Sequence, residues 1–149
     1  MNAENRQSDL FNLNNKTEQV IGLGIDILEV ARIENIIKKG DNNFINRVFT
    51  PGEIEYCESK KDFAESFAVR FSAKEAFIKA VESDYNIPYR DIEVIKKESK
   101  KPAIVLSGLA QKAAKEKKVS GIMLSLSHEK NYVVANIILK GVHIDSIKS

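Results

Sequence analysis

One long helical segment that carries charges on its apolar side constrains the fold of this 149-residue chain most strongly. The segment runs from Asp62 to Val81, and at about 100° per residue its predicted apolar stripe consists of Phe63, Phe67, Phe71 and Ile78. Lys74 and Glu75 fall within or beside this stripe, and Lys79 borders it. Because burying an unpaired charge is costly, these groups require an ion, a ligand or another subunit as a partner.

A second constraint is the alternating segment V-I-G-L-G-I-D-I-L at residues 20–28. Alternation with a period of two predicts a strand with two distinct faces. We expect the core face to carry Ile21, Leu23, Ile25 and Ile27. The opposite face carries Gly22, Gly24 and Asp26, and glycines there would let a backbone or a ligand approach closely.

The other segments predict short elements on either side of the long helix. Helices are expected over 30–39, 44–49 and 108–117, and another begins at Thr50 with Glu53 closing a capping box. Strands are expected over 92–96, 103–106, 123–128 and 132–139, the last two joined as a hairpin. The predicted class is α+β, with an antiparallel sheet packed against one long and several short helices. Residues 20–149 would form one domain after a flexible extension at 1–19.

The composition argues against several classes of protein. Lys and Arg number 23 against 21 Asp and Glu, so the net charge of +2 is unlike that of a general nucleic-acid binder. No apolar run reaches the length of a membrane span. Cys57 is the single cysteine, which fits a reducing compartment and a half-buried position in a helix. We therefore expect a cytoplasmic protein that binds neither nucleic acid nor membrane.

Asp26 and Glu75 are the leading candidates for a metal site. They come from a strand end and a helix, which can converge in the fold although they are far apart in the sequence. Two carboxylates together with ligand phosphates are a common way for proteins to hold Mg²⁺. A capping Asp and a salt-bridged Glu would explain the same residues, so spacing alone leaves both interpretations open.

Basic and hydroxyl side chains are candidates for phosphate binding. Three basic residues flank Glu75 on its helix, namely Arg70, Lys74 and Lys79. They could form a cationic cradle, or a solvated helix edge with an i,i+4 pair between Glu75 and Lys79. His128 ends a strand, where it either makes a structural hydrogen bond or contacts a ligand together with Ser127.

Three segments, taken together, resemble the signatures of one enzyme family. They are G-I-D-I-L-E-V-A-R-I-E at 24–34, F-A-V-R-F-S-A-K-E-A-F-I-K-A at 67–80 and S-L-S-H-E-K-N-Y-V-V-A at 125–135. Their order and spacing are similar to those of the holo-[acyl-carrier-protein] synthases, the short form of the 4′-phosphopantetheinyl transferase family. The resemblance implies that family's fold and a Mg²⁺-dependent reaction of fatty acid biosynthesis. Coenzyme A would donate its phosphopantetheine arm to a serine of apo acyl carrier protein, and 3′,5′-ADP would leave.

The resemblance also implies roles for the matching positions. Asp26 and Glu75 would hold Mg²⁺ and act in catalysis with Lys79, which would contact the pyrophosphate. Coenzyme A would be held by Arg70, Lys74, Ser127 and His128. Arg32 would dock onto an acidic helix of the carrier protein. The group that deprotonates the serine is left open.

Short members of the family resemble homotrimers with active sites between subunits, and we expect the same assembly here. One segment departs from the family pattern, since residues 81–91 contain no glycine where the family has a glycine-rich stretch. Two other hypotheses remain, a module that binds coenzyme A or an adenine nucleotide without transfer, and a module that only binds the carrier. Nucleotide binding without turnover would favour the first, and carrier binding without Mg²⁺ or coenzyme would favour the second.

Overall fold

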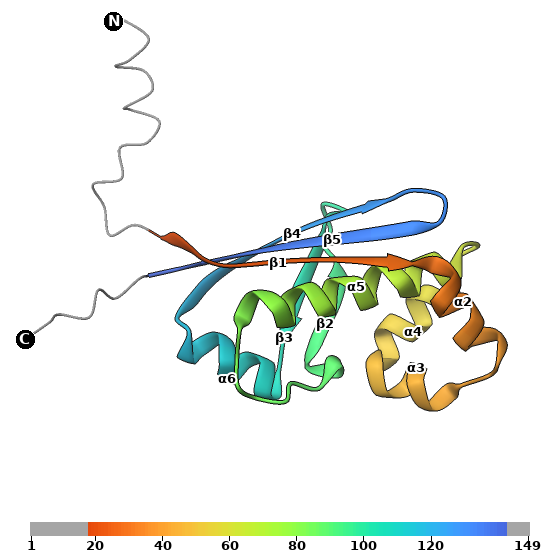
Figure 1. Ribbon diagram of the computed structural model, residues 1–149, viewed down its shortest axis with the longest axis horizontal. Coiled ribbons are helices and arrows are strands. Elements are labelled where there is room, and N and C mark those ends of the chain that lie inside the picture. Colours follow the sequence, from red (N-terminus) through yellow and green to blue (C-terminus); the bar gives the residue numbers. More distant parts are fainter. Residues whose placement is uncertain (1–17, 143–149) are drawn as a thin grey trace, which may run out of the picture.

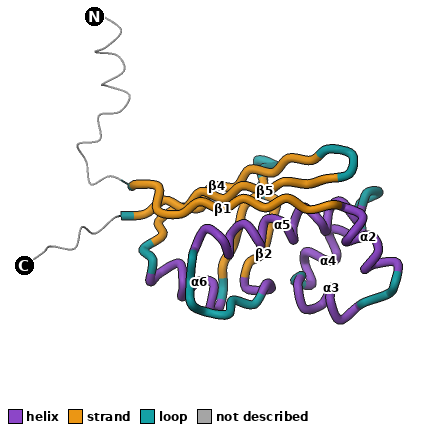
Figure 2. The backbone as a smooth tube through the Cα atoms, viewed as in Figure 1, coloured by secondary structure: helices purple, strands orange, loops and turns teal. Residues whose placement is uncertain are grey.

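The computed structural model describes residues 18–142, which form a sheet layer with helices beneath it (Figures 1 and 2). In chain order the elements are β1 (Gln19–Glu29), α2 (Val30–Lys38), α3 (Asn42–Val48), α4 (Pro51–Glu58), α5 (Phe63–Val81), η1 (Tyr89–Asp91), β2 (Ile92–Lys96), β3 (Pro102–Leu106), α6 (Gly108–Glu116), β4 (Val119–His128) and β5 (Tyr132–Gly141). An antiparallel sheet has the order β1-β5-β4, and β2 and β3 form a second antiparallel pair. The predicted α+β class with an antiparallel sheet is confirmed.

Local signals in the sequence place several elements correctly. Thr50 and Glu53 form the expected capping box of α4, in which Thr50 Oγ1 accepts from the Glu53 N–H at 3.2 Å and Glu53 Oε1 accepts from the Thr50 N–H at 3.0 Å. Gly40 follows α2 with a φ of +67°, in the left-handed region that glycine adopts easily. β4 and β5 form the expected hairpin.

Ile21 packs against the core as predicted, but after the register irregularity between Val20 and Gly22 the face of β1 that meets the core is the opposite of the predicted one. Gly24 is buried against α5, and a β-carbon there would overlap the carbonyl oxygen of Ala76. A β-carbon at Gly22 would likewise overlap the carbonyl oxygen of Ala80. The glycine face, with Asp26, therefore lies directly on the helix, because main chain packs on main chain where side chains are absent.

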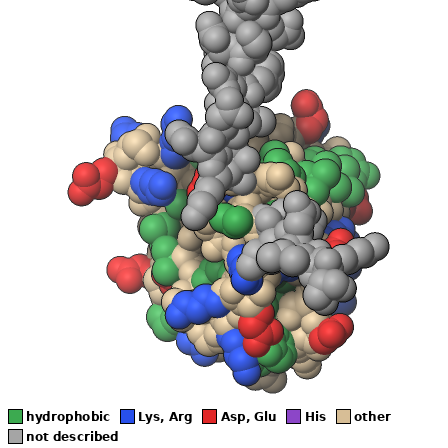
Figure 3. Space-filling view, turned by 90° about the vertical axis from the view of Figure 1, so that its left-hand side faces the viewer, with side chains coloured by type: hydrophobic (Ala, Val, Ile, Leu, Met, Phe, Trp, Pro, Cys, Tyr) green, Lys and Arg blue, Asp and Glu red, His purple; other side chains and the backbone are tan. Residues whose placement is uncertain are grey.

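The aliphatic face of β1 points away from the helices. Leu23, Ile25 and Ile27 are 64%, 61% and 66% exposed, although the alternation predicted them in the core. The register places them in rows with Val134, Ile138 and Met123 of the neighbouring strands. No described helix covers this side of the sheet in Figure 1, and the end-on view of Figure 3 shows hydrophobic side chains at the surface. The sheet thus presents an apolar outer face.

Helix α5 is buried over more of its circumference than the predicted stripe implied. Phe67 is buried as expected, whereas Phe63 is 42% exposed and the buried positions extend to Ala73, Ala76 and Phe77. The small residues face β1, where they allow the close contact with its glycines. The helix therefore has few positions at which a charged side chain reaches water.

Glu82 ends α5 in a left-handed conformation, with φ 46° and ψ 50°. Such a conformation costs a residue other than glycine about 1–3 kcal/mol. We expect Glu82→Gly to raise the midpoint of thermal unfolding by about 2–4 °C, because relief of this strain exceeds the entropy that glycine adds to the unfolded chain. The matched control is Glu82→Gln, which removes the exposed ion pair with Lys117 (3.7 Å) but keeps the β-carbon. A lower midpoint for Glu82→Gly than for Glu82→Gln would contradict the prediction.

The predicted extension at 1–19 lies mostly outside the described residues, but Gln19 already belongs to β1. Within residues 18–142, no helix combines the length and apolar character needed to cross a membrane.

Candidate functional site

The Asp26 carboxylate is held between two residues of α5. Ser72 Oγ lies 2.9 Å from Asp26 Oδ2 and 3.1 Å from the Asp26 carbonyl oxygen. Lys79 Nζ donates to Asp26 Oδ1 at 3.1 Å and to the Ile25 carbonyl at 3.0 Å. The Lys79 side chain is 53% exposed, so its ammonium group is paired and also accessible to solvent. These contacts fix Asp26 over the middle of the helix.

Glu75 lies on the same side of α5 as these contacts. Residues three and four apart share a helix face, so Ser72, Glu75 and Lys79 form one row. The hydroxyl group of Tyr89 donates to Glu75 Oε1 at 2.6 Å. Burial, and then this bond to Glu75, raises the pKa of Tyr89 to about 12, and the charge of Asp26 acts in the same direction. The structure thus pairs Asp26 with Lys79 and places Glu75 on the same face of α5.

Sequence reasoning missed two members of this cluster, Ser72 and Tyr89. Ser72 had a usable signal, since it stands three residues before Glu75 and therefore shares its helix face. Tyr89 had none, because it comes from η1 and its bond to Glu75 depends on the tertiary fold.

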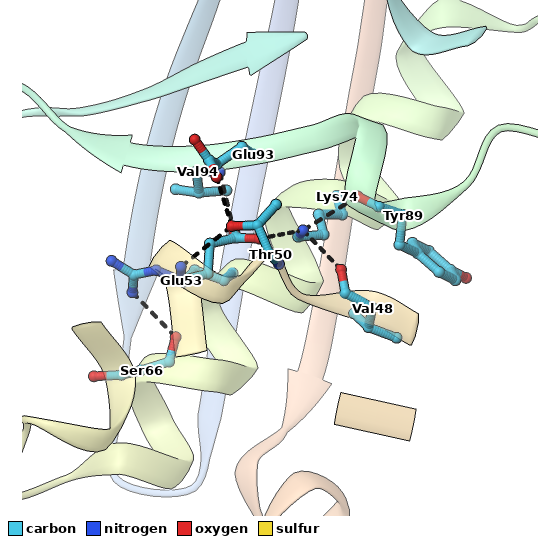
Figure 4. Close-up of polar contacts among 9 residues, drawn as sticks. Val48, Thr50, Glu53, Ser66, Lys74, Tyr89, Glu93 and Val94 are labelled. Carbon is cyan, nitrogen blue, oxygen red and sulfur yellow. Dashed lines mark hydrogen bonds and ion pairs between the residues drawn. The ribbon is translucent and has the colours of Figure 1, made fainter. Parts of the chain in front are cut away.

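Lys74 has a structural position instead of the predicted contact with coenzyme. Its side chain is fully buried, and its ammonium group donates to Glu53 Oε1 at 2.6 Å, the Val48 carbonyl at 2.8 Å and the Tyr89 carbonyl at 3.1 Å. Burial lowers the pKa of Lys74, and the charge of Glu53 opposes this. Three donors meet three acceptors in Figure 4, so the group has no donor left for a ligand. It joins α5 to the segments around it.

Arg70 lies on another side of α5, roughly 140° around the axis from Glu75. It is 8% exposed, and its guanidinium carbon lies 4.2 Å from the centre of the Tyr56 ring. Its Nη1 donates to the Ser66 carbonyl at 3.2 Å, while its buried Nε has no partner within residues 18–142. A cavity of about 480 Å³ adjoins it, with a lining that includes Lys96, Lys100 and Lys101. These groups form a second, basic site.

Within residues 18–142, the remaining predicted residues make no hydrogen bond or ion pair with Asp26 or Glu75. Ser127 pairs in register with Val134, which pairs with Ile27, so it belongs to the outer face of the sheet. His128 Nδ1 lies 3.4 Å from Glu65 Oε1, in the first turn of α5. Arg32 is exposed on α2. One chain therefore does not assemble all the predicted coenzyme contacts around its own carboxylates.

The donor set at Asp26 and Glu75 fits a hard divalent cation. Both residues supply carboxylate oxygens, and Mg²⁺ is usually held by one or two carboxylates with waters and substrate phosphates. Within residues 18–142, no group of three or more His, Cys, Asp and Glu side chains is arranged to bind a metal. A two-carboxylate site that a phosphate ligand completes is the arrangement these residues allow.

The comparisons with known proteins decide the family. The 4′-phosphopantetheinyl transferase superfamily matches residues 22–137, a span that includes Asp26, Glu75 and Lys79. The chain belongs to this superfamily. The chain is 41% identical over 118 residues to a holo-[acyl-carrier-protein] synthase of Halothermothrix orenii, covering 78% of this chain and 94% of that one.

Two solved structures show the same phosphopantetheinyl transferase fold. A Plasmodium yoelii acyl carrier protein synthase with ADP bound has a TM-score of 0.75 at 33% identity, covering 85% of this chain and 99% of that one. A Bacillus anthracis holo-(acyl-carrier-protein) synthase in complex with CoA (3′,5′-ADP) has a TM-score of 0.67 at 32% identity, covering 84% and 99%.

Cys57 of this phosphopantetheinyl transferase is fully buried, beyond the half-buried position predicted. Burial raises the pKa of its thiol to about 11. The thiol is therefore protonated at neutral pH, which argues against a nucleophilic role.

Proposed function

We infer that this protein transfers 4′-phosphopantetheine from coenzyme A to a serine of apo acyl carrier protein. A bond forms between the serine oxygen and the phosphorus that carries pantetheine. The bond from that phosphorus to the bridging oxygen breaks, and this oxygen leaves with 3′,5′-ADP, while the serine proton goes to solvent or a base. The ion pair of Asp26 with Lys79, on the helix face that also carries Glu75, in a chain of this family is the observation that carries the inference.

We propose that Asp26 and Glu75 hold Mg²⁺ at this site. When bound, the cation would offset the negative charge of the pyrophosphate and of the leaving nucleotide. Ser72 and Lys79 keep the Asp26 carboxylate in place. The exposed ammonium group of Lys79 can also meet a pyrophosphate oxygen, because a lysine has three donors and only two are used. Charge compensation by the cation and positioning by Ser72 and Lys79 suit a displacement that depends mainly on positioning and electrostatics.

The basic site at Arg70 supports a role in binding the coenzyme. A buried guanidinium nitrogen without a partner beside three lysines favours an anionic ligand, and coenzyme A carries phosphates. Ser127 and His128 remain proposed coenzyme contacts. Because Ser127 belongs to the outer face of the sheet, they would serve a site formed with a neighbouring subunit.

Arg32 is proposed to meet the acidic carrier protein. Its side chain is exposed on α2, the helix that directly follows the strand carrying Asp26. A basic side chain there would guide a negatively charged partner towards the carboxylates and orient it.

We propose a homotrimer that buries the outer face of the sheet. Besides its exposed aliphatic side chains, this face contains Asn136, whose buried Oδ1 has no hydrogen-bond partner within residues 18–142. A second copy would remove the aliphatic surface from water and offer the amide oxygen a donor.

Ile25→Lys is expected to convert the trimer into monomers, because it places a charge in the centre of the proposed interface. Size-exclusion chromatography with light scattering would give the mass. Leu109→Lys, which changes an exposed leucine of α6, is the control that should keep the trimer mass. An unchanged mass for Ile25→Lys would rule out this interface.

Intact mass spectrometry tests the proposed reaction directly. Apo acyl carrier protein incubated with the enzyme, coenzyme A and Mg²⁺ should gain the mass of one phosphopantetheine group. No gain on any of several carriers would overturn the inference. Calorimetry that then showed coenzyme binding would favour a nucleotide-binding module instead.

A further inference from the structure

Two consecutive residues of α5 form hydrogen bonds with Tyr89, one with its main chain and one with its side chain. Its carbonyl oxygen accepts from Lys74 at 3.1 Å, and its hydroxyl group donates to Glu75 Oε1 at 2.6 Å. Figure 4 shows the Tyr89 ring directed away from the Lys74 ammonium group, so the two contacts lie at opposite ends of the residue. The buried lysine therefore fixes the main chain from which the tyrosine reaches the carboxylate.

The ring of Tyr89 is also held by aromatic packing. It meets Phe71 edge-on with ring centres 5.4 Å apart, and Phe71 meets Phe44 at 5.6 Å. Such edge-to-face pairs favour this orientation of the ring. Its hydroxyl group lies 2.6 Å from Glu75 Oε1, and a short hydrogen bond to a charged acceptor is among the stronger ones. The donor is thus both rigid and directed at one oxygen.

We propose that Tyr89 is a positioning residue for the metal site, whose hydrogen bond to Oε1 would hold the Glu75 carboxylate in one orientation for the cation. The proposal rests on the magnesium-dependent function inferred above. Glu75 has three rotatable side-chain bonds, and fixing them before the cation arrives lowers the entropic cost of binding. The residues next to metal ligands commonly act in this way, and their loss lowers metal affinity by about 10–100-fold.

Tyr89→Phe tests the proposal, because it removes only the hydroxyl group and keeps the ring packed on Phe71. Mn²⁺ would be titrated into the enzyme with saturating coenzyme A, and the free ion followed by electron paramagnetic resonance. We expect the dissociation constant for Mn²⁺ to rise about tenfold. The Mg²⁺ concentration for half-maximal rate should rise by a similar factor, with the KM for the carrier protein unchanged.

The matched control is Tyr85→Phe. The Tyr85 hydroxyl group donates to Glu116 at the same 2.6 Å distance, but Glu116 belongs to α6 and not to the metal site. This variant should bind Mn²⁺ within about twofold of the wild type, a margin small beside the 10–100-fold loss expected at metal-site neighbours. Circular dichroism melts of both variants would confirm that each is folded at the assay temperature.

The outcomes separate this proposal from the function on which it rests. If the wild-type enzyme bound no Mn²⁺, the proposed metal site itself would be refuted. Wild-type binding with less than a twofold change in Tyr89→Phe would leave the function standing and overturn the positioning role. An equal loss of affinity in Tyr89→Phe and Tyr85→Phe would also overturn it, because the effect would then not depend on Glu75.

Discussion

Glu75→Gln is expected to lower kcat for phosphopantetheine transfer by at least about 100-fold, and Asp26→Asn by a similar factor. Each change removes one of the two charges proposed to hold the cation, while the side chain keeps its shape. The amide oxygen that Glu75→Gln introduces could still accept the Tyr89 hydrogen bond, so the fold should be retained. Initial rates with apo carrier protein, coenzyme A and several Mg²⁺ concentrations would measure the loss.

Glu116→Gln is the matched control for this experiment. Glu116 also accepts a tyrosine hydroxyl group at 2.6 Å, so the same chemical change is made in a similar bond away from Asp26. Its rate should stay within about twofold of the wild-type rate, since surface substitutions away from a site usually have small effects. Near-normal turnover in Glu75→Gln or Asp26→Asn would exclude that residue from the metal site.

Lys74→Met should lower the free energy of unfolding by about 3–5 kcal/mol. The side chains of Lys74 and Glu53 are 0% and 1% exposed, so the substitution leaves a buried carboxylate without its counter-ion. Glu53 also accepts hydrogen bonds from the Thr50 and Val94 N–H groups, so it cannot turn towards water without breaking them. Urea unfolding followed by circular dichroism would give the difference.

A double-mutant cycle with Glu53→Gln identifies the cause of this loss. The double variant should be more stable than the two single changes predict when added, by about 0.5–3 kcal/mol, because neither charge is then left alone. Lys38→Met provides the comparison for an exposed pair, since Lys38 and Glu34 lie 2.8 Å apart with side chains 70% and 44% exposed. It should change the unfolding free energy by less than about 1 kcal/mol. Equal losses at positions 38 and 74 would contradict the role of burial.

The sequence predicted those parts of the fold that depend on neighbours in the chain. The capping box at Thr50 and the β4–β5 hairpin need contacts between nearby residues only, and both were correct. The orientation of β1 was wrong because alternation separates two faces without saying which one meets the core. Glycines opposite small residues of a helix decided that question, and this depends on the partner element.

The candidate site likewise contains residues that sequence patterns identify and residues whose role depends on the tertiary fold. Of the predicted residues, Asp26 and Lys79 form an ion pair, and Glu75 lies on the same face of α5 as Lys79. Lys74 stands beside Glu75 in the chain but about 100° away around the helix, which turns it into the interior instead of the site. Its three acceptors come from different segments, so no local pattern could have revealed its buried role.

The close contact between the glycines of β1 and helix α5 sets the distance between the strand and the helix that carry the proposed metal ligands. Because atoms of two main chains touch there, the strand that carries Asp26 can move no nearer to the helix that carries Glu75. The spacing of the two carboxylates is thus limited by atomic radii, whereas long side chains between the elements would have let it vary with their rotamers. The distance between the two proposed metal ligands therefore depends on Gly22 and Gly24, two residues that have no side chain.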